Sequence, residues 1–75
     1  MYTHRQIIDL HSCKLAIAID IFMKALNQSR MERKALSLQF ITGRGIILEN
    51  YLLMAKEAEL DVVNIGYGCI VITFE

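Results

Sequence analysis

The chain has 75 residues, 55% of them hydrophobic, and its 8 basic and 8 acidic residues give a formal net charge of zero. A chain of this length holds one hydrophobic core, so we expect a single domain over residues 1–75. The composition is too apolar for a disordered chain, and no apolar run reaches the roughly 18 residues that a membrane span needs.

Hydrophobic periodicity predicts a strand followed by a helix at the start of the chain. The run QIIDL at 6–10 is short, apolar and partly β-branched, which is typical of a buried strand. Apolar residues then recur at helical spacing from Leu15 to Leu26. Ser12 is the expected N-cap of this helix and Asn27 lies near its expected end.

A second strand and a second helix follow. The polar segment 28–34 is expected to connect the first helix to 35–41, where apolar and polar residues alternate as in a half-exposed strand. Segment 46–60 contains no helix breaker and is rich in strong helix formers, so it predicts a helix.

The last part of the chain predicts a hairpin. Two β-rich runs, 62–65 and 69–74, are joined through the Gly66–Gly68 segment. The element order is therefore βαβαββ. Because a strand, helix, strand unit gives a parallel pair, we expect an α/β two-layer sandwich: a four-stranded mixed sheet with two helices on one face.

Charge is distributed unevenly along the chain although its sum is zero. Up to Gly45 there are seven basic and three acidic residues, which gives +4, and beyond Gly45 one base and five acids give −4. A dipolar chain of this kind can present a positive surface to phosphates. The other interpretation is that these charges only keep the surface solvated.

Cysteine usage and the start of the sequence bear on location and on metals. No basic segment followed by a long apolar stretch begins the chain, which favours a cytoplasmic location, where Cys13 and Cys69 remain thiols. His11 with Cys13 or His4 is a conceivable metal site, but no ligand set with zinc-like spacing is complete. We therefore expect neither a metal nor a cofactor.

The sequence FITGRGIILEN at 40–50 is the first candidate site. Gly43 and Gly45 flank Arg44 at the turn from the second strand into the second helix, the edge where open α/β folds bind ligands. Glycines let a phosphate approach the backbone N–H groups of a helix start, and an arginine can bind the same anion. Alternatively, the glycines only turn the chain and Arg44 points into water.

Asp9 and His11 form the second candidate site. Being two residues apart at the end of the first strand, they project to the same face in an extended segment. A carboxylate can orient an imidazole and stabilise its protonated form, so His11 is a candidate general acid or base. The alternative is a structural pair, with Asp9 as a loop carboxylate and His11 as a partly buried polar residue.

These two motifs, IDLH at 8–11 and ITGRG at 41–45 in a βαβαββ order, resemble the Smr domain family. Members typically carry Leu-Asp-x-His at the first strand and a Thr or His followed by Gly-x-Gly before the second helix. Ile8 replaces the leucine here, whereas Asp9 and His11 match. The glycine loop matches at Thr42, Gly43 and Gly45, with Arg44 in the variable position.

The resemblance implies nucleic-acid binding and, in some members, endonuclease activity. It implies Asp9 and His11 as catalytic residues and a loop for phosphate or nucleic acid, comprising Thr42, Gly43, Arg44 and Gly45. On this hypothesis the protein is a metal-independent endonuclease, with RNA a better candidate than DNA as its substrate.

Two alternatives remain open at this point. GRGIILE is also similar to the arginine-glycine loop of Alba-like domains, which bind DNA or RNA as dimers without cleaving it. The other alternative is a small homodimeric interaction domain. Ile46, Leu53 and Leu60 recur at seven-residue intervals and form a stripe that either packs on the first helix or contacts a second chain.

Overall fold

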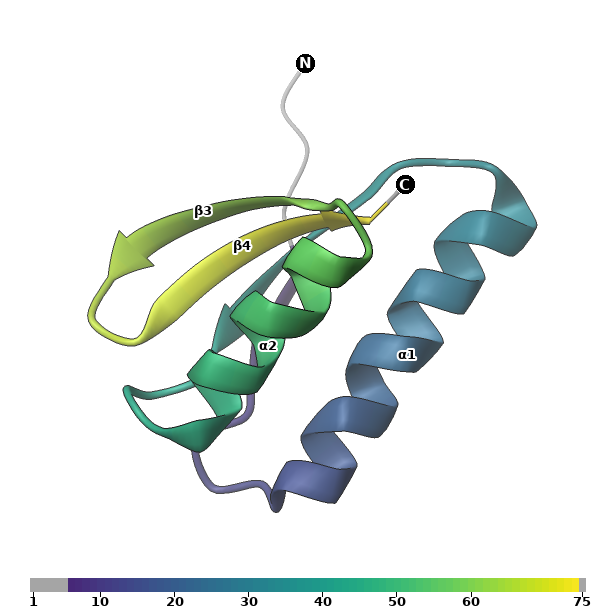
Figure 1. Cartoon of the computed structure of the whole chain (residues 1–75). Helices are drawn as coiled ribbons and strands as arrows, with labels where there is room; N and C mark the ends of the chain where they lie inside the picture. Colours follow the sequence, from purple (N-terminus) through teal and green to yellow (C-terminus); the bar gives the residue numbers. More distant parts are fainter. Residues whose placement is uncertain (1–5, 75) are drawn as a thin grey trace.

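A computed structural model describes residues 6–74 and contains the predicted order of elements (Figure 1). The elements are β1 (Gln6–Asp9), α1 (Leu15–Glu32), β2 (Leu36–Ile41), α2 (Ile46–Glu57), β3 (Asp61–Gly66) and β4 (Cys69–Phe74). The prediction of an α/β fold with a four-stranded mixed sheet is confirmed.

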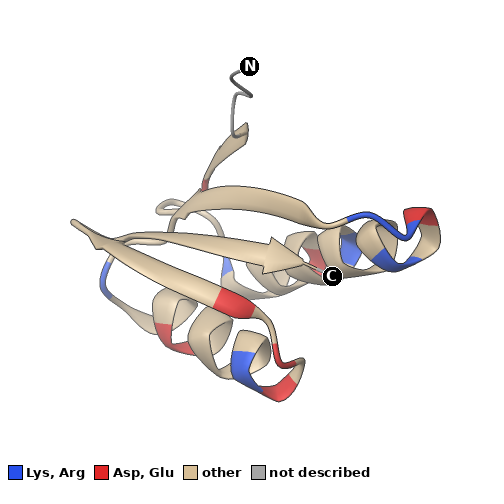
Figure 2. Cartoon of the chain, turned by 90° about the horizontal axis from the view of Figure 1, so that it is seen from above, with Lys and Arg blue, Asp and Glu red and all other residues tan. Residues whose placement is uncertain are grey.

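The sheet has the strand order β1-β2-β4-β3. β1 and β2 are parallel, whereas β4 is antiparallel to both β2 and β3. Both helices pack on the same face of the sheet (Figures 1 and 2). Each helix therefore begins near the carboxyl end of the strand before it and runs back along the sheet, which brings the β1–α1 and β2–α2 loops to one edge.

Four aromatic rings form the centre of the core between the helices and the sheet. Phe22 and Tyr51, from the helices, make edge-to-face contacts with each other and with Phe74 and Phe40, from the sheet, at centroid separations of 5.0–5.1 Å. The Tyr51 hydroxyl donates to the carbonyl oxygen of Ala18 at 2.5 Å, so the one polar atom of this cluster has a partner. Burial raises the pKa of Tyr51 well above its ordinary value.

Helix α1 starts later than the sequence predicted. The Cys13 N–H donates to the carbonyl oxygen of Leu10, which forms a turn directly after β1. Because this turn occupies the segment where the helix was expected to begin, the N-cap is Lys14 rather than Ser12. The N-cap prediction was therefore wrong, and α1 starts without a side-chain cap.

Helix α1 also ends later than predicted, because the polar segment assigned to the connection is mostly helical. Ser29 is buried at the last turn, with its hydroxyl 2.7 Å from the Lys34 carbonyl oxygen and 2.9 Å from that of Phe74. The helix then ends at Arg33, which takes the left-handed conformation (φ 54°). Within residues 6–74, neither helix is long and apolar enough to cross a bilayer.

The sheet face opposite the helices has no helix on it among the described residues (Figure 2). Because side chains alternate along a strand, one row across this face can be followed by strand register: Ile7, Gln39, Val71 and Val63. Ile7 and Val63, at the two edge strands, are exposed, and Val71 in the middle is buried.

Candidate functional site

Three connecting segments come together at one end of the sheet (Figure 1). The Leu10 N–H, just after β1, donates to the carbonyl oxygen of Ile41, the last residue of β2, at 2.8 Å. The carbonyl oxygen of Gly68, in the β3–β4 hairpin, accepts from the N–H groups of Thr42 and Gly43 at 2.8 and 3.1 Å. The two candidate motifs and the hairpin are thus linked through their backbones.

Asp9 and His11 form a contact on the surface of this edge. Asp9 Oδ1 lies 2.5 Å from His11 Nδ1 and also accepts the His11 backbone N–H at 3.1 Å. The His11 and Asp9 side chains are 62% and 51% exposed. The hydrogen bond from the His11 ring lowers the pKa of Asp9, and the His11 backbone N–H lowers it further. With Nδ1 held by the carboxylate, Nε2 is the ring nitrogen available to a ligand.

Thr42 lies behind the glycine loop rather than on its surface. It is 3% exposed, and its hydroxyl is 3.1 Å from the Gly68 carbonyl oxygen and 3.0 Å from that of Gly43. Of the predicted binding residues, Thr42 and Gly43 therefore hold the loop against the hairpin, while Arg44 and Gly45 are exposed.

Gly43 and Gly68 are required by the backbone at this end of the sheet, whereas Gly45 is not. Gly43 has a φ of +73°, which favours glycine, and Gly68 contacts it so closely that a Cβ on Gly68 would lie 2.8 Å from Gly43 Cα. Gly45 has a φ of −112°, and a Cβ there would meet nothing within 4 Å. The fold therefore needs glycine at 43 and 68, whereas at Gly45 it leaves open space above the backbone.

Both helices begin at this edge without a side-chain cap. The N-caps are Lys14 for α1 and Gly45 for α2, and neither has a side-chain hydrogen bond to the helix start. First-turn N–H groups and the helix dipole give each start a partial positive charge. Lys14 and Arg44 are exposed beside these starts, and no carboxylate in the described part of the chain pairs with Arg44.

The described basic residues of the first half of the sequence are spread along the molecule, with Lys24 in the middle of α1 paired with Asp20. Because α1 runs back along the sheet, Arg30 in its last turn, and Arg33 and Lys34 directly after it, lie at the far end of the helix, away from the glycine loop. Figure 2 shows Lys and Arg residues at this end of α1. Acidic residues, including Glu57 and Asp61, lie at the same far end. The described basic residues of the first half of the sequence therefore do not form one surface, and among residues 6–74 Lys14 and Arg44 are the cations beside the helix starts.

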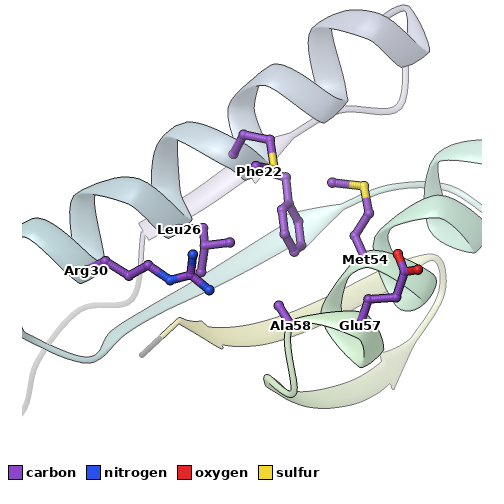
Figure 3. A pocket seen from close by; sticks show the side chains of 7 residues that line it. Phe22, Leu26, Arg30, Met54, Glu57 and Ala58 are labelled. Carbon is purple, nitrogen blue, oxygen red and sulfur yellow. The ribbon is translucent and has the colours of Figure 1, made fainter.

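A groove of about 290 Å³ lies between α1 and α2 (Figure 3). Phe22, Leu26 and Met54 supply apolar lining, and Arg30 of α1 and Glu57 of α2 add one charge of each sign. The sequence analysis did not find this groove, because it depends on how the two helices diverge. The groove lies outside the end of the sheet where the β1–α1, β2–α2 and β3–β4 loops meet.

Tyr67 was also missed by the sequence analysis. It lies at the tip of the β3–β4 hairpin, next to the Gly68 that contacts the glycine loop, and is 91% exposed. The available signal was the residue type itself: a tyrosine between two glycines stands where hairpin turns normally carry Asn, Asp or Gly.

Comparisons with protein-family models, with curated proteins and with solved structures found no match for this chain. The resemblance to the Smr family therefore rests on the motifs at 8–11 and 41–45 and on the order of elements. Among residues 6–74 there is no group of three or more His, Cys, Asp or Glu side chains placed to hold a metal ion. His4, the other histidine considered for such a site, lies outside the described residues.

Proposed function

We propose that the chain is a nucleic-acid-binding domain of the Smr type. It acts on RNA at the end of its sheet where the β1–α1, β2–α2 and β3–β4 loops meet. One observation carries this proposal. The Asp9–His11 pair and the loop at 42–45 follow neighbouring parallel strands, joined by the hydrogen bond from the Leu10 N–H to the Ile41 carbonyl oxygen. A phosphodiester bound at the loop therefore lies at the same edge as the imidazole.

The glycine loop provides the phosphate-binding part of the proposal. The start of α2 offers backbone N–H groups and a partial positive charge without a competing side-chain cap. Gly45 leaves the space above it open, and Arg44 has no carboxylate partner within residues 6–74. An anionic phosphate oxygen would meet both groups at once, and a guanidinium forms strong charge-assisted hydrogen bonds with such an oxygen.

His11 provides the chemical part. In RNA cleavage the 2′-oxygen attacks the phosphorus, a new P–O2′ bond forms and the P–O5′ bond breaks, while one proton leaves the 2′-hydroxyl and one reaches the leaving 5′-oxygen. His11 Nε2 would carry out one of these transfers as general base or general acid. Asp9 would fix the orientation of the ring through Nδ1. This scheme requires no metal ion.

The test is incubation of the purified protein with labelled single-stranded RNA and duplex DNA, with and without a chelator, so that binding and cleavage are read in the same gels. We expect RNA fragments that persist in chelator and disappear with His11→Ala, while RNA binding by this variant is largely retained. Arg44→Ala should weaken binding and reduce the salt dependence by about one phosphate contact. Lys56→Ala, far from the site at the end of α2, is the matched cation control.

The outcomes separate the parts of the proposal. Equal cleavage by the wild type and by His11→Ala would reject the catalytic role. Shifted but intact bands would reduce the function to binding alone, as in the Alba-like alternative. If Arg44→Ala and Lys56→Ala weaken binding equally, the glycine loop is not the phosphate site.

A second candidate, association of two chains through α2, is favoured by a different observation. Ile46 and Leu53, both on the predicted stripe, are 58% and 56% exposed, so they do not pack on α1. Leu60, by contrast, packs against the core. We propose that Ile46 and Leu53 contact a second copy of the chain. Sedimentation at several concentrations tests this: a dimer that Leu53→Glu converts to monomer supports it, and a strict monomer at high concentration rejects it.

A further inference from the structure

Tyr67 occupies a turn position that is unfavourable for it. Gly66 pairs with Cys69, so the loop between β3 and β4 is the two-residue segment of Tyr67 and Gly68. Their φ angles are +55° and +73°. Positive φ at both central residues is the type I′ hairpin turn, whose first position prefers Asn, Asp or Gly. A bulky residue held at positive φ costs conformational free energy.

The tyrosine side chain makes no buried packing contact that would offset this cost. It is the most exposed of the large hydrophobic residues in the described chain, at 91%, whereas Tyr51 is fully buried. The exposed ring of Tyr67 departs from the residue preference of this turn and makes no packing contact that compensates for the strain. Strained positions of this kind occur more often at functional sites than at purely structural ones.

The hairpin fixes where this ring stands. The Gly68 carbonyl oxygen accepts from the N–H groups of Thr42 and Gly43 and lies 3.1 Å from the Thr42 hydroxyl. Arg44, the exposed cation of the loop, directly follows Gly43 in the sequence. The turn that carries Tyr67 is thus tied by its backbone to the loop that carries Arg44.

We propose that Tyr67 stacks on an unpaired base of a single-stranded nucleic acid whose backbone phosphate is bound at the Arg44 loop. This inference rests on the proposed nucleic-acid function and adds its substrate class. Base faces are accessible to an aromatic side chain in single strands, whereas in a duplex they are covered by neighbouring base pairs. A phosphate site beside a stacking residue is the combination that single-strand binders use.

The experiment measures affinity for an unstructured single-stranded RNA, for a single-stranded DNA of the same sequence, and for a duplex. Tyr67→Phe keeps the ring and should bind like the wild type. Tyr67→Asn places a preferred turn residue at this position, so it should unfold at the same or a higher temperature and yet bind single strands roughly 5- to 100-fold more weakly. The salt dependence should stay unchanged, because stacking releases no counterions.

A strand with abasic sites makes the test specific to stacking. The wild type should bind it as weakly as Tyr67→Asn does, and Tyr67→Asn should lose little further affinity. Tyr67→Trp adds a tryptophan to a chain that has none, and its fluorescence should be quenched by the normal strand and not by the abasic one.

The two proposals fail in different ways. If the wild type binds single strands and Tyr67→Asn binds them equally well, or if the variant loses the same affinity on the abasic strand, the stacking role is rejected and the phosphate site stands. A preference for duplex over single strands also rejects the stacking role. If the wild type binds no nucleic acid at all, both proposals are wrong.

Discussion

Gly43 and Gly68, 25 residues apart in sequence, are in direct backbone contact: a Cβ on Gly68 would lie 2.8 Å from Gly43 Cα and 3.1 Å from Gly43 N. No flexible side chain could move aside to relieve this contact. The β3–β4 hairpin and the β2–α2 loop therefore keep a fixed spacing, which holds the proposed stacking and phosphate-binding residues relative to each other.

Alanine substitutions should distinguish Gly68, which the fold requires, from Gly45, which lies at the proposed phosphate site. Gly68→Ala introduces the backbone clash at a φ of +73°, so we expect a loss of about 2 kcal/mol or more in the free energy of unfolding. Gly45→Ala meets nothing within 4 Å, so stability should change by no more than about 0.5 kcal/mol while RNA binding weakens. Urea unfolding and a binding titration check both. Unchanged RNA affinity of Gly45→Ala would contradict close phosphate approach.

The Asp9 carboxyl group should titrate below its ordinary pKa of 3.8, since the His11 ring and backbone N–H stabilise the carboxylate. A folded-state pKa below the unfolded one means that this contribution to stability is full at pH values above the unfolded pKa and is lost as the pH falls through the folded value. Carboxyl-carbon NMR titration measures it. In His11→Ala the pKa should rise toward 3.8 but not fully reach it, because the backbone donor remains. An unchanged pKa in that variant would contradict the ring contact.

Tyr51→Phe should lower stability by about 1 kcal/mol, because the hydroxyl donates to the Ala18 carbonyl oxygen in the buried core. The ring contacts with Phe22 and Phe40 are retained in this variant, so the loss reports the hydrogen bond alone. Tyr67→Phe removes the same atom from an exposed ring and serves as the control, with no measurable change expected. Equal stability of the two variants would show that the Tyr51 hydroxyl contributes nothing.

Arg33→Gly should stabilise the protein by about 0.5–1 kcal/mol, because glycine takes the left-handed conformation that ends α1 without a Cβ penalty. Arg30→Gly, three residues earlier, is matched in side chain and charge but lies within the helix. It should destabilise the protein by about 1 kcal/mol. Thermal unfolding of the two variants measures the difference, and shifts of the same sign would contradict the assigned end of α1.

The order of the elements along the chain and the loops of the site could be predicted from the sequence because they depend on local patterns. Alternating apolar residues in β2, the β-rich run of β4 and the glycines at 43, 45, 66 and 68 mark the elements and the turns. A parallel β1–β2 pair then brings their carboxyl ends together by topology. The proximity of the Asp9–His11 pair to the glycine loop follows from these two steps.

Other features depend on contacts that no local pattern reports. The polar end of α1 is helical because Ser29 finds its partners at Lys34 and at Phe74, the latter 45 residues away. The distribution of charge along the sequence did not predict its distribution on the folded molecule. Because α1 runs back along the sheet, Arg33 and Lys34 lie at the end of the molecule opposite Arg44. Only Tyr67 carried a readable signal that was overlooked.

β1, whose described residues are Gln6–Asp9, lies at the edge of the sheet and, within residues 6–74, pairs only with β2, about thirty residues further along the chain. Edge segments with few neighbours open locally at a lower free energy than the strands between them. Fraying of β1 would carry Asp9 and His11 off the molecule while β2, β4 and β3 remain paired. Amide protons of β1 should therefore exchange with solvent faster than those of β4, and on warming the proposed RNA cleavage should be lost before the protein unfolds.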